Sequence, residues 1–205
     1  LGLPRKLEEA LDALGTAGPR SMDLMRVAGP DRWGANASAG GMSGEVDEAV
    51  SPEIKATWGP LAYVRSALEV VSDPPSYRVV LTGTEGTLWE GEALNVLVAN
   101  GRTVAGGIPV SPTAVLDDGL LDVVVVKAGP LASLAGFASL CLLGRHLEHE
   151  LVVHHRVTSL EVGSDPPMPF NVDGELVGET PVEYSVRPGA LRVLAAADAP
   201  GLGRS

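Results

Sequence analysis

Glycine and proline interrupt this chain so often that it has little room for long helices. Its 205 residues include 25 Gly and 16 Pro, scattered among short apolar stretches. Between these breaks the apolar residues alternate with polar ones, as at 77–81 and at 182–186. Successive side chains of a β-strand point to opposite faces, so this period of two indicates strands with one buried face. The sequence therefore predicts a mainly β fold of short strands joined by turns.

Three segments have helical character instead. Residues 4–14 place leucines at helical spacing, and residues 60–71 begin at a proline and end before a Pro-Pro pair. The third segment, 131–143, is an apolar run between a proline and a glycine. It is shorter than the roughly 20 apolar residues that span a bilayer. We interpret it as a buried helix, with a helix on a membrane surface as the alternative.

Charge and cysteine content narrow the class of protein. With 15 basic and 26 acidic residues the formal net charge is −11, which repels nucleic acid and anionic membrane surfaces. The single cysteine, Cys141, cannot form an internal disulfide, and this indicates a reducing compartment such as the cytoplasm. We expect Cys141 to be a buried, small apolar residue. The last residues, 195–205, are expected to form a flexible tail.

The segment Asn171-Val172-Asp173-Gly174-Glu175 sets two carboxylates two residues apart around a glycine. On an extended chain such residues face the same way, so Asp173 and Glu175 could serve one chemical site. The structural alternative is a hairpin in which Asp-Gly supplies the turn. The five residues alone do not decide between these interpretations.

A second acidic cluster, Asp117, Asp118 and Asp122, surrounds a glycine ahead of a predicted strand. Hard divalent cations prefer carboxylate oxygens and loop carbonyls, and a turn at Asp118-Gly119 could supply both. The alternative is a solvated Asp-Gly turn.

Four histidines between 146 and 155 suggest a zinc site, but their spacing matches neither a zinc protease nor a zinc finger. We therefore favour a solvated helix end for this segment. The sequence also lacks a Gly-x-Gly-x-x-Gly motif, a phosphate-binding loop and a Gly-x-Ser-x-Gly elbow. It thus contains no recognisable nucleotide cradle and gives little support to a serine hydrolase.

Taken in order, these elements resemble the diacylglycerol kinase and sphingosine kinase superfamily, particularly its bacterial soluble lipid kinases. No single motif is decisive, but ten occur in register along nearly the whole chain. They are Leu1-Gly2-Leu3-Pro4, Asp23, Asn36 with Gly41, Gly59-x-x-Ala62-Tyr63, Ala99-Asn100-Gly101, Gly106-Gly107, Pro112-x-Ala114, Asp118-Gly119-x-Leu121-Asp122, Gly144-x-His146 and Asp173-Gly174-Glu175.

The resemblance implies a two-domain kinase in which only the second domain is present here. That domain is a β-sandwich of antiparallel strands with a few inserted helices, expected over 1–194, with 1–20 leading in from the first. The first domain of such kinases carries a Gly-Gly-Asp-Gly-Thr motif and binds ATP, and this chain lacks it. Because the chain also begins without methionine, we take it as part of a longer polypeptide.

The resemblance also implies roles for individual residues. Glu175 and Asp173 would face the cleft between the domains, where one accepts the proton of a lipid hydroxyl. We favour Glu175 as the base, with Asp173 as orienter or co-base. A structural Mg²⁺ would be held by the Asp118 carboxylate and by the carbonyls of Val115 and Leu120. The substrate would be a diacylglycerol-like or sphingoid lipid, and ATP the co-substrate.

Two hypotheses follow. The chain is the base-bearing, lipid-binding half of a lipid kinase in the cytoplasm, with peripheral contact at the inner membrane face, or it is a non-catalytic β-sandwich module derived from such kinases. A Gly-Gly-Asp-Gly-Thr motif encoded upstream would favour the first. The sequence leaves the exact lipid and the oligomeric state, including a homodimer, open.

Overall fold

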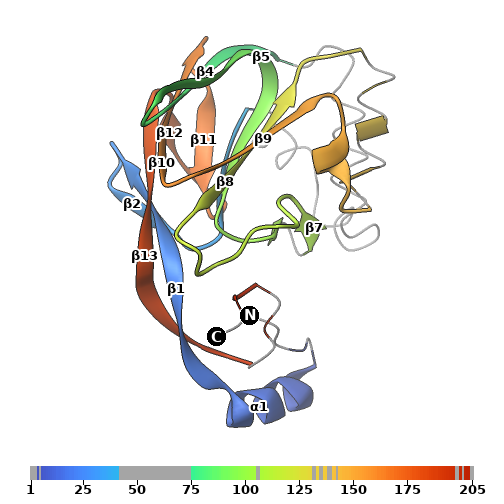
Figure 1. Ribbon diagram of the computed structural model, residues 1–205, viewed down its shortest axis with the longest axis vertical. Coiled ribbons are helices and arrows are strands. Elements are labelled where there is room, and N and C mark those ends of the chain that lie inside the picture. Colours follow the sequence, from blue (N-terminus) through green and yellow to red (C-terminus); the bar gives the residue numbers. More distant parts are fainter. Residues whose placement is uncertain are drawn as a thin grey trace.

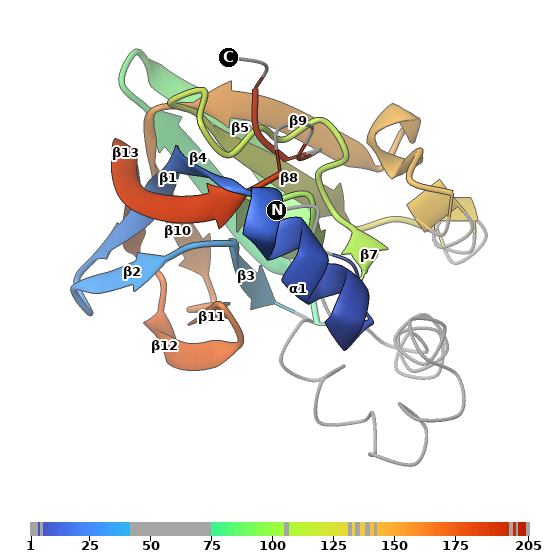
Figure 2. The same ribbon diagram turned by 90° about the horizontal axis from the view of Figure 1, so that it is seen from below.

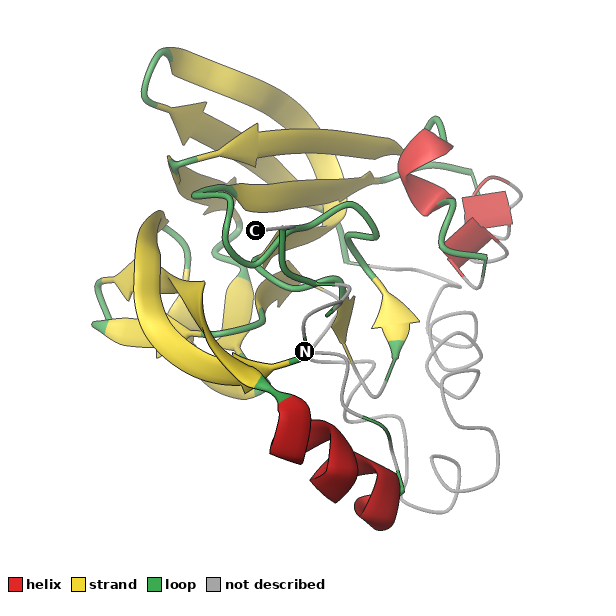
Figure 3. Ribbon diagram, turned by 60° about the horizontal axis from the view of Figure 1, so that its bottom comes forward, coloured by secondary structure: helices red, strands yellow, loops and turns green. Residues whose placement is uncertain are grey.

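The computed structural model describes residues 4, 6–41, 75–104, 107–130, 133, 136–137, 140–141, 143–196, 199 and 201–203. Strands dominate this part of the chain, and the described helices lie at the periphery of the strands (Figure 3). The elements are α1 (Leu7–Thr16), β1 (Gly18–Ala28), β2 (Arg32–Gly34), β3 (Ala37–Gly41), β4 (Tyr77–Gly83), β5 (Gly86–Ala99), β6 (Thr103–Val104), β7 (Ile108–Pro109), β8 (Leu121–Lys127), the 3₁₀ helix η1 (His146–Glu148), β9 (Val152–Val157), β10 (Ser159–Asp165), β11 (Pro169–Val172), β12 (Glu175–Glu179) and β13 (Val182–Ala195).

One curled antiparallel sheet contains eleven of the described strands. Its main path runs β12-β11-β3-β5-β4-β10-β13-β1-β2, and β8 branches off β5 and pairs in turn with β9. Strand β5 contributes to the curl, because its first half pairs with β4 and its second half pairs with β3. Strand β13 pairs with β1 along its length and with β10 only at its beginning. The predicted fold class, mainly β with antiparallel strands in a sandwich-like arrangement, is confirmed (Figure 1).

The main hydrophobic core lies inside this curl. Leu121, Val123 and Val125 of β8 are fully buried in it, on one face of the strand. The period of two predicted at 77–81 and 182–186 is found in β4 and β13, whose alternate residues are buried. Strands β1, β4, β5, β10, β11 and β13 contribute further buried side chains to the same core. Burial of alternate residues on so many strands fixes the register of the sheet, since a one-residue slip would expose the whole apolar set.

The two ends of the sheet path come together. Strand β2 is at one end, the hairpin β11-β12 is at the other, and β2 contacts β11 across the gap (Figures 1 and 2). We call this junction the seam. It brings residues near the N-terminus next to the Asp173 turn.

A second, smaller core holds the end of the chain. Ala195, Ala199 and Leu202 are buried against Met22 and Leu116. The Leu116 N–H donates to the Gly201 carbonyl at 2.7 Å. The expectation of a flexible tail over 195–205 is therefore corrected for its described residues. Small side chains and backbone hydrogen bonds, which carry little sequence signal, hold this segment in place.

Helix α1 begins three residues after the predicted start and buries none of its residues. The predicted helix at 60–71 lies outside the described residues. Of the predicted helix at 131–143, residues 133, 136–137, 140–141 and 143 are described, and all of these except 143 are helical. Within the described ranges, no helix is long and apolar enough to cross a membrane.

Candidate functional site

The Asp173-Gly174 pair forms the turn of the hairpin β11-β12. Val172 and Glu175 pair directly across it, and both turn residues have positive φ, 50° for Asp173 and 91° for Gly174. This backbone is that of a two-residue type I′ turn, in which Asp and Gly are favoured. The hairpin alternative is thus confirmed. The extended spacing that would aim both carboxylates the same way is not found.

The Asp173 carboxylate binds the backbone on the other side of the seam. Its Oδ2 accepts the N–H of Ala35 at 2.7 Å, and its Oδ1 accepts those of Asn36 at 3.0 Å and Ala37 at 2.9 Å. In return, the Asp173 N–H donates to the Ala37 carbonyl at 2.8 Å. Both oxygens are therefore committed, and Asp173 anchors the hairpin to the link between β2 and β3.

The same link is held from its other side by the Ala99-Asn100-Gly101 motif. The N–H groups of Asn100 and Gly101 both donate to the Asn36 carbonyl, at 2.8 and 2.9 Å. A Cβ on Gly101 would come within 2.1 Å of the Asn36 side-chain oxygen, so any larger residue would force the Asn36 side chain to move. Asn36 and Asn100 thus position the backbone that Asp173 binds.

A cavity of roughly 180 Å³ opens at the seam beside this anchor. Glu175 lines it, and among the described residues no hydrogen bond or ion pair engages the Glu175 carboxylate. An ionised carboxylate with free lone pairs can accept a proton from a bound ligand. The residues lining the cavity are Arg32, Trp33, Val172, Asp173, Glu175 and Val177.

The structure therefore brings Asp173 and Glu175 to one cavity, with the Asp173 carboxylate bonded to the backbone and the Glu175 carboxylate unbonded among the described residues. Arg32 and Trp33 also line it and were not expected from the sequence. They lie about 140 residues away along the chain, and only the curl of the sheet places β2 beside the hairpin. No local pattern could have identified them.

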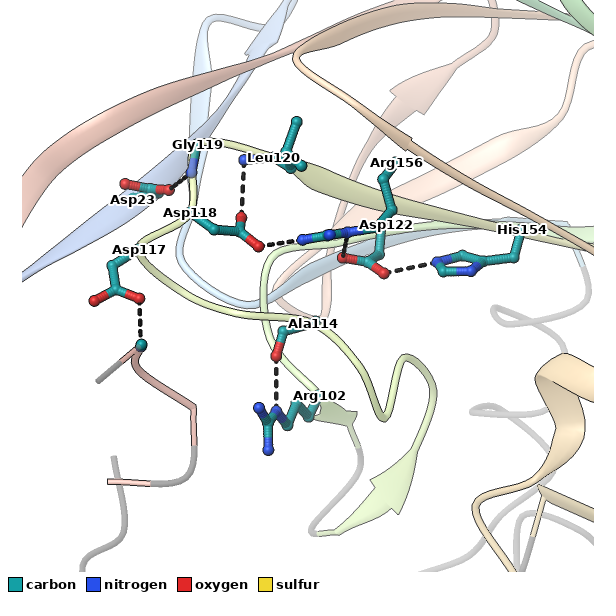
Figure 4. A network of polar contacts seen from close by, with 11 residues as sticks. Asp23, Arg102, Ala114, Asp117, Asp118, Gly119, Leu120, Asp122, His154 and Arg156 are labelled. Atoms are coloured by element: carbon teal, nitrogen blue, oxygen red, sulfur yellow. Dashed lines mark hydrogen bonds and ion pairs between the residues drawn. The ribbon is translucent and has the colours of Figure 1, made fainter. Parts of the chain in front are cut away.

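The acidic residues around Gly119 do not converge on one point (Figure 4). Asp118 Oδ1 accepts the Leu120 N–H at 3.0 Å, and its Oδ2 pairs with the Arg156 guanidinium. Asp117 Oδ1 accepts the Gly203 N–H at 2.6 Å. The two acids thus use separate partners, one at a strand and one at the end of the chain.

Asp122 and Asp23 extend this region inward. The buried Asp122 accepts a hydrogen bond from His154 Nε2 at 2.7 Å and lies 3.7 Å from Arg156 Nε. Asp23, also buried, accepts the N–H groups of Gly119 and Gly189, each at 2.7 Å. It thereby fixes the acidic turn against β1.

The donors expected for a magnesium ion can be tested against this geometry. Asp118 lies in a turn made possible by Gly119, whose φ is 74°, with Val115 and Leu120 on either side in sequence. One carboxylate with loop carbonyls suits a hard cation. Arg156 already supplies a positive charge to the same carboxylate, so a metal would share Asp118 with it or displace it. Within the described ranges, no group of three or more His, Cys, Asp or Glu side chains forms a metal cluster.

The ring nitrogens of three of the histidines have different hydrogen-bond partners. His146 is buried, and its Nε2–H donates to the Val110 carbonyl at 2.8 Å; burial lowers its pKa. His154 binds Asp122, and His149 Nδ1 accepts the Leu151 N–H at 3.2 Å. The expectation of a solvated helix end is therefore wrong for His146, which packs edge-on against Phe137.

Comparison with known proteins places this geometry in a family. The family model for the YegS C-terminal NAD kinase beta sandwich-like domain matches residues 36–195. "Probable lipid kinase YegS-like" of Pseudomonas syringae pv. syringae is 33% identical over 202 residues, which cover 98% of this chain and 64% of that protein. "Diacylglycerol kinase" of Staphylococcus carnosus is 29% identical, with coverage of 90% and 59%. The chain thus spans less than two thirds of the length of these relatives.

Solved structures agree on the fold. A crystal structure from Bacillus anthracis str. Sterne superposes with a TM-score of 0.79 at 25% identity, covering 97% of this chain and 64% of that one. A second, of a diacylglycerol kinase from the same organism, gives a TM-score of 0.69 at 21% identity and covers 97% and 62% of the two chains. The match of family model, sequence and fold leads to one conclusion: the chain belongs to the family of YegS C-terminal NAD kinase beta sandwich-like domains.

Proposed function

We propose that this chain is the base-bearing, lipid-binding part of an ATP-dependent lipid kinase. Its relatives are named as lipid kinases and as a diacylglycerol kinase, and they are longer than this chain. The additional part of such an enzyme would bind ATP. The substrate would carry a free hydroxyl, as diacylglycerol-like and sphingoid lipids do.

The observation that carries the proposal is the contrast between the two carboxylates of the seam cavity. Asp173 has both oxygens bonded to backbone N–H groups, whereas Glu175 has none of its oxygens engaged by a described residue. A general base needs an accessible lone pair and a fixed position. Glu175 has accessible lone pairs, and the anchored turn next to it holds it in position.

The reaction then follows the general course of phosphoryl transfer. The lipid hydroxyl oxygen attacks the γ-phosphorus of ATP, the bond from that phosphorus to the β-γ bridging oxygen breaks, and ADP leaves. The hydroxyl proton passes to Glu175. Asp173 does not take this proton in our assignment; it holds the hairpin in register with the link between β2 and β3.

We further propose that the Asp118 turn holds a structural Mg²⁺ through the Asp118 carboxylate and the carbonyls of Val115 and Leu120. Such an ion would stiffen the turn by neutralising its charge. Because the substrate would be a membrane lipid, the proposal also places the enzyme in the cytoplasm, in peripheral contact with the inner membrane face.

The test joins this chain to the segment that the Pseudomonas syringae relative has in addition, and measures turnover with ATP, Mg²⁺ and dioctanoylglycerol. Glu175→Gln should lower kcat by about 100- to 10,000-fold, the usual contribution of a general base. The matched control is Glu179→Gln, on the same strand but outside the cavity. Its turnover should match that of the parent.

Both variants should unfold at nearly the parent temperature, since exposed substitutions seldom change stability. If Glu175→Gln turned over at the parent rate with unchanged KM, the base assignment would be lost. The non-catalytic lipid-binding module would then be the better description of the domain.

A further inference from the structure

Arg32 lies on the interior face of the sheet, at its free edge. In the β1-β2 ladder it pairs with Val27, and Gly34 pairs with Met25. Val27 and Met25 are both fully buried, and directly paired residues share a face of a sheet. The Arg32 side chain therefore leaves β2 on the side of the core, although the residue itself is exposed.

That side of β2 faces the Asp173 hairpin. A Cβ built on Gly34 would lie 2.9 Å from Val172 Cγ1 and 3.8 Å from Asp173 Oδ2. Arg32 is two residues earlier on the same face, and it lines the cavity together with Glu175. Arg32 and Glu175 thus reach one cavity from opposite sides of the seam.

The charge of Arg32 is not compensated within the part of the chain that is described. Five other described arginines have acidic partners, for example Arg26 with Asp31 and Arg78 with Glu90. No such pair is formed by Arg32, although two carboxylates line the same cavity. Asp173 is already bonded to backbone N–H groups, which leaves the guanidinium available to a ligand.

We propose that Arg32 binds the phosphate of a phosphomonoester in the seam cavity. This inference rests on the proposed function, because a hydroxyl deprotonated at Glu175 becomes the ester oxygen of a new phosphate. A phosphate next to two carboxylates is repelled by both, and a nearby cation offsets this repulsion. The guanidinium is suited to the task because its planar N–H groups match two phosphate oxygens at once.

A structural role for Arg32 is the alternative. Charged residues that point inward on edge strands prevent edge-to-edge pairing of sheets. In that case the charge would protect the monomer and would not affect ligand affinity. The two roles therefore differ in what an uncharged variant does to phosphate binding.

The experiment titrates this chain with dihexanoyl phosphatidate, dihexanoylglycerol and inorganic phosphate. The readout is the indole ¹H–¹⁵N NMR signal of Trp33, which lines the cavity and is 51% exposed. The chain has three tryptophans, so Trp33→Phe assigns the signal. We expect the phosphatidate to bind more tightly than the glyceride. Inorganic phosphate should weaken the apparent binding of the phosphatidate and leave that of the glyceride unchanged.

Arg32→Gln should weaken phosphatidate binding by about 10- to 100-fold, the value of hydrogen bonds to a charged group, and leave the glyceride unaffected. The phosphatidate affinity of Arg32→Lys should lie between those of the parent and of Arg32→Gln, because lysine keeps the charge but cannot match two phosphate oxygens at once. Arg192→Gln, on an exposed arginine of β13 outside the cavity, is the matched control.

The proposal is overturned if Arg32→Gln binds phosphatidate as the parent does, or if phosphatidate causes no larger shift than the glyceride in the parent chain. Increased self-association of Arg32→Gln with unchanged affinity would establish edge protection instead. Glu175→Gln should bind phosphatidate at least as tightly as the parent. The kinase assay of Glu175→Gln tests the base, and the binding assay of Arg32→Gln tests the phosphate site. Either proposal can therefore fail without the other.

Discussion

The side-chain amide of Asn100 donates to the main-chain carbonyl of Asp23 at 2.8 Å, and also to that of Ala35 at 3.0 Å. The Ala35 N–H binds the Asp173 carboxylate, and the Asp23 carboxylate binds the N–H of Gly119, next to Asp118. One continuous set of hydrogen bonds therefore joins the hairpin turn at the seam to the acidic turn before β8. Asn100 is its centre and is almost fully buried.

Asn100→Ala should therefore be strongly destabilising. The change removes two hydrogen bonds and leaves buried carbonyls without a donor, which costs about 2–4 kcal/mol in free energy of unfolding. Urea denaturation followed by circular dichroism measures this loss. The control is Asn171→Ala, a half-buried asparagine for which no side-chain hydrogen bond is found among the described residues. Equal urea midpoints for the two variants would contradict the central role of Asn100.

Asp173→Asn should behave differently from Glu175→Gln. The amide replaces one acceptor oxygen by a donor that faces the N–H groups of residues 35–37, so at least one charge-assisted bond is lost. We expect a loss of about 1–3 kcal/mol in stability. Glu175→Gln should stay within about 0.5 kcal/mol of the parent. Thermal unfolding compares the two, and equal melting temperatures would show that the anchor is unimportant.

Sequence reasoning succeeded where a local rule decides the structure. The Asp-Gly turn and the buried faces of β4 and β13 follow from turn chemistry and from alternation. It failed where the partner is distant. The bond between Asp173 and Ala37 spans 136 residues, and that between Asp118 and Arg156 spans 38.

The Pro188-Gly189 pair illustrates the same limit within a strand. A Pro-Gly pair is typical of a turn, but β13 continues through it as a bulge. The extra residues make room for Asp23, whose carboxylate accepts the Gly189 N–H. A bulge of this kind depends on a buried acid on the neighbouring strand, which the local sequence does not reveal.

This chain alone should not phosphorylate lipid. Phosphoryl transfer depends mainly on positioning ATP, and the sequence contains no loop of the kind that cradles its phosphates. The assay incubates the isolated chain with ATP, Mg²⁺ and dioctanoylglycerol and measures phosphatidate. The same chain joined to the additional segment of a relative is the positive control. Comparable turnover by the two proteins would refute the proposal that the additional segment binds ATP.

Cys141 should resist alkylation in the folded protein. Burial raises the pKa of its thiol to about 12, so the reactive thiolate is scarce at neutral pH. The folded state favours the protonated form, and this contribution to stability is present below the ordinary pKa of 9.0 and lost as pH rises towards 12. Iodoacetamide labelling followed by mass spectrometry should be slow at pH 8 and fast in urea. Rapid labelling of the folded chain would contradict the burial.

Mg²⁺ should stabilise this chain through Asp118, and Arg156 should oppose it. A ligand that binds only the folded state stabilises it by about 1.4 kcal/mol at ten times its Kd, which raises the melting temperature by about 3–6 °C in a chain of this size. Asp118→Ala should abolish that rise. Arg156→Gln should enlarge it, because the guanidinium pairs with the same carboxylate that the metal would use.

Asp31→Ala, at an exposed acid in the β1-β2 turn, is the control and should leave the rise unchanged. An Mg²⁺ response that persists in Asp118→Ala would remove Asp118 from the site. No response in any variant, Arg156→Gln included, would refute the Mg²⁺ site at this turn.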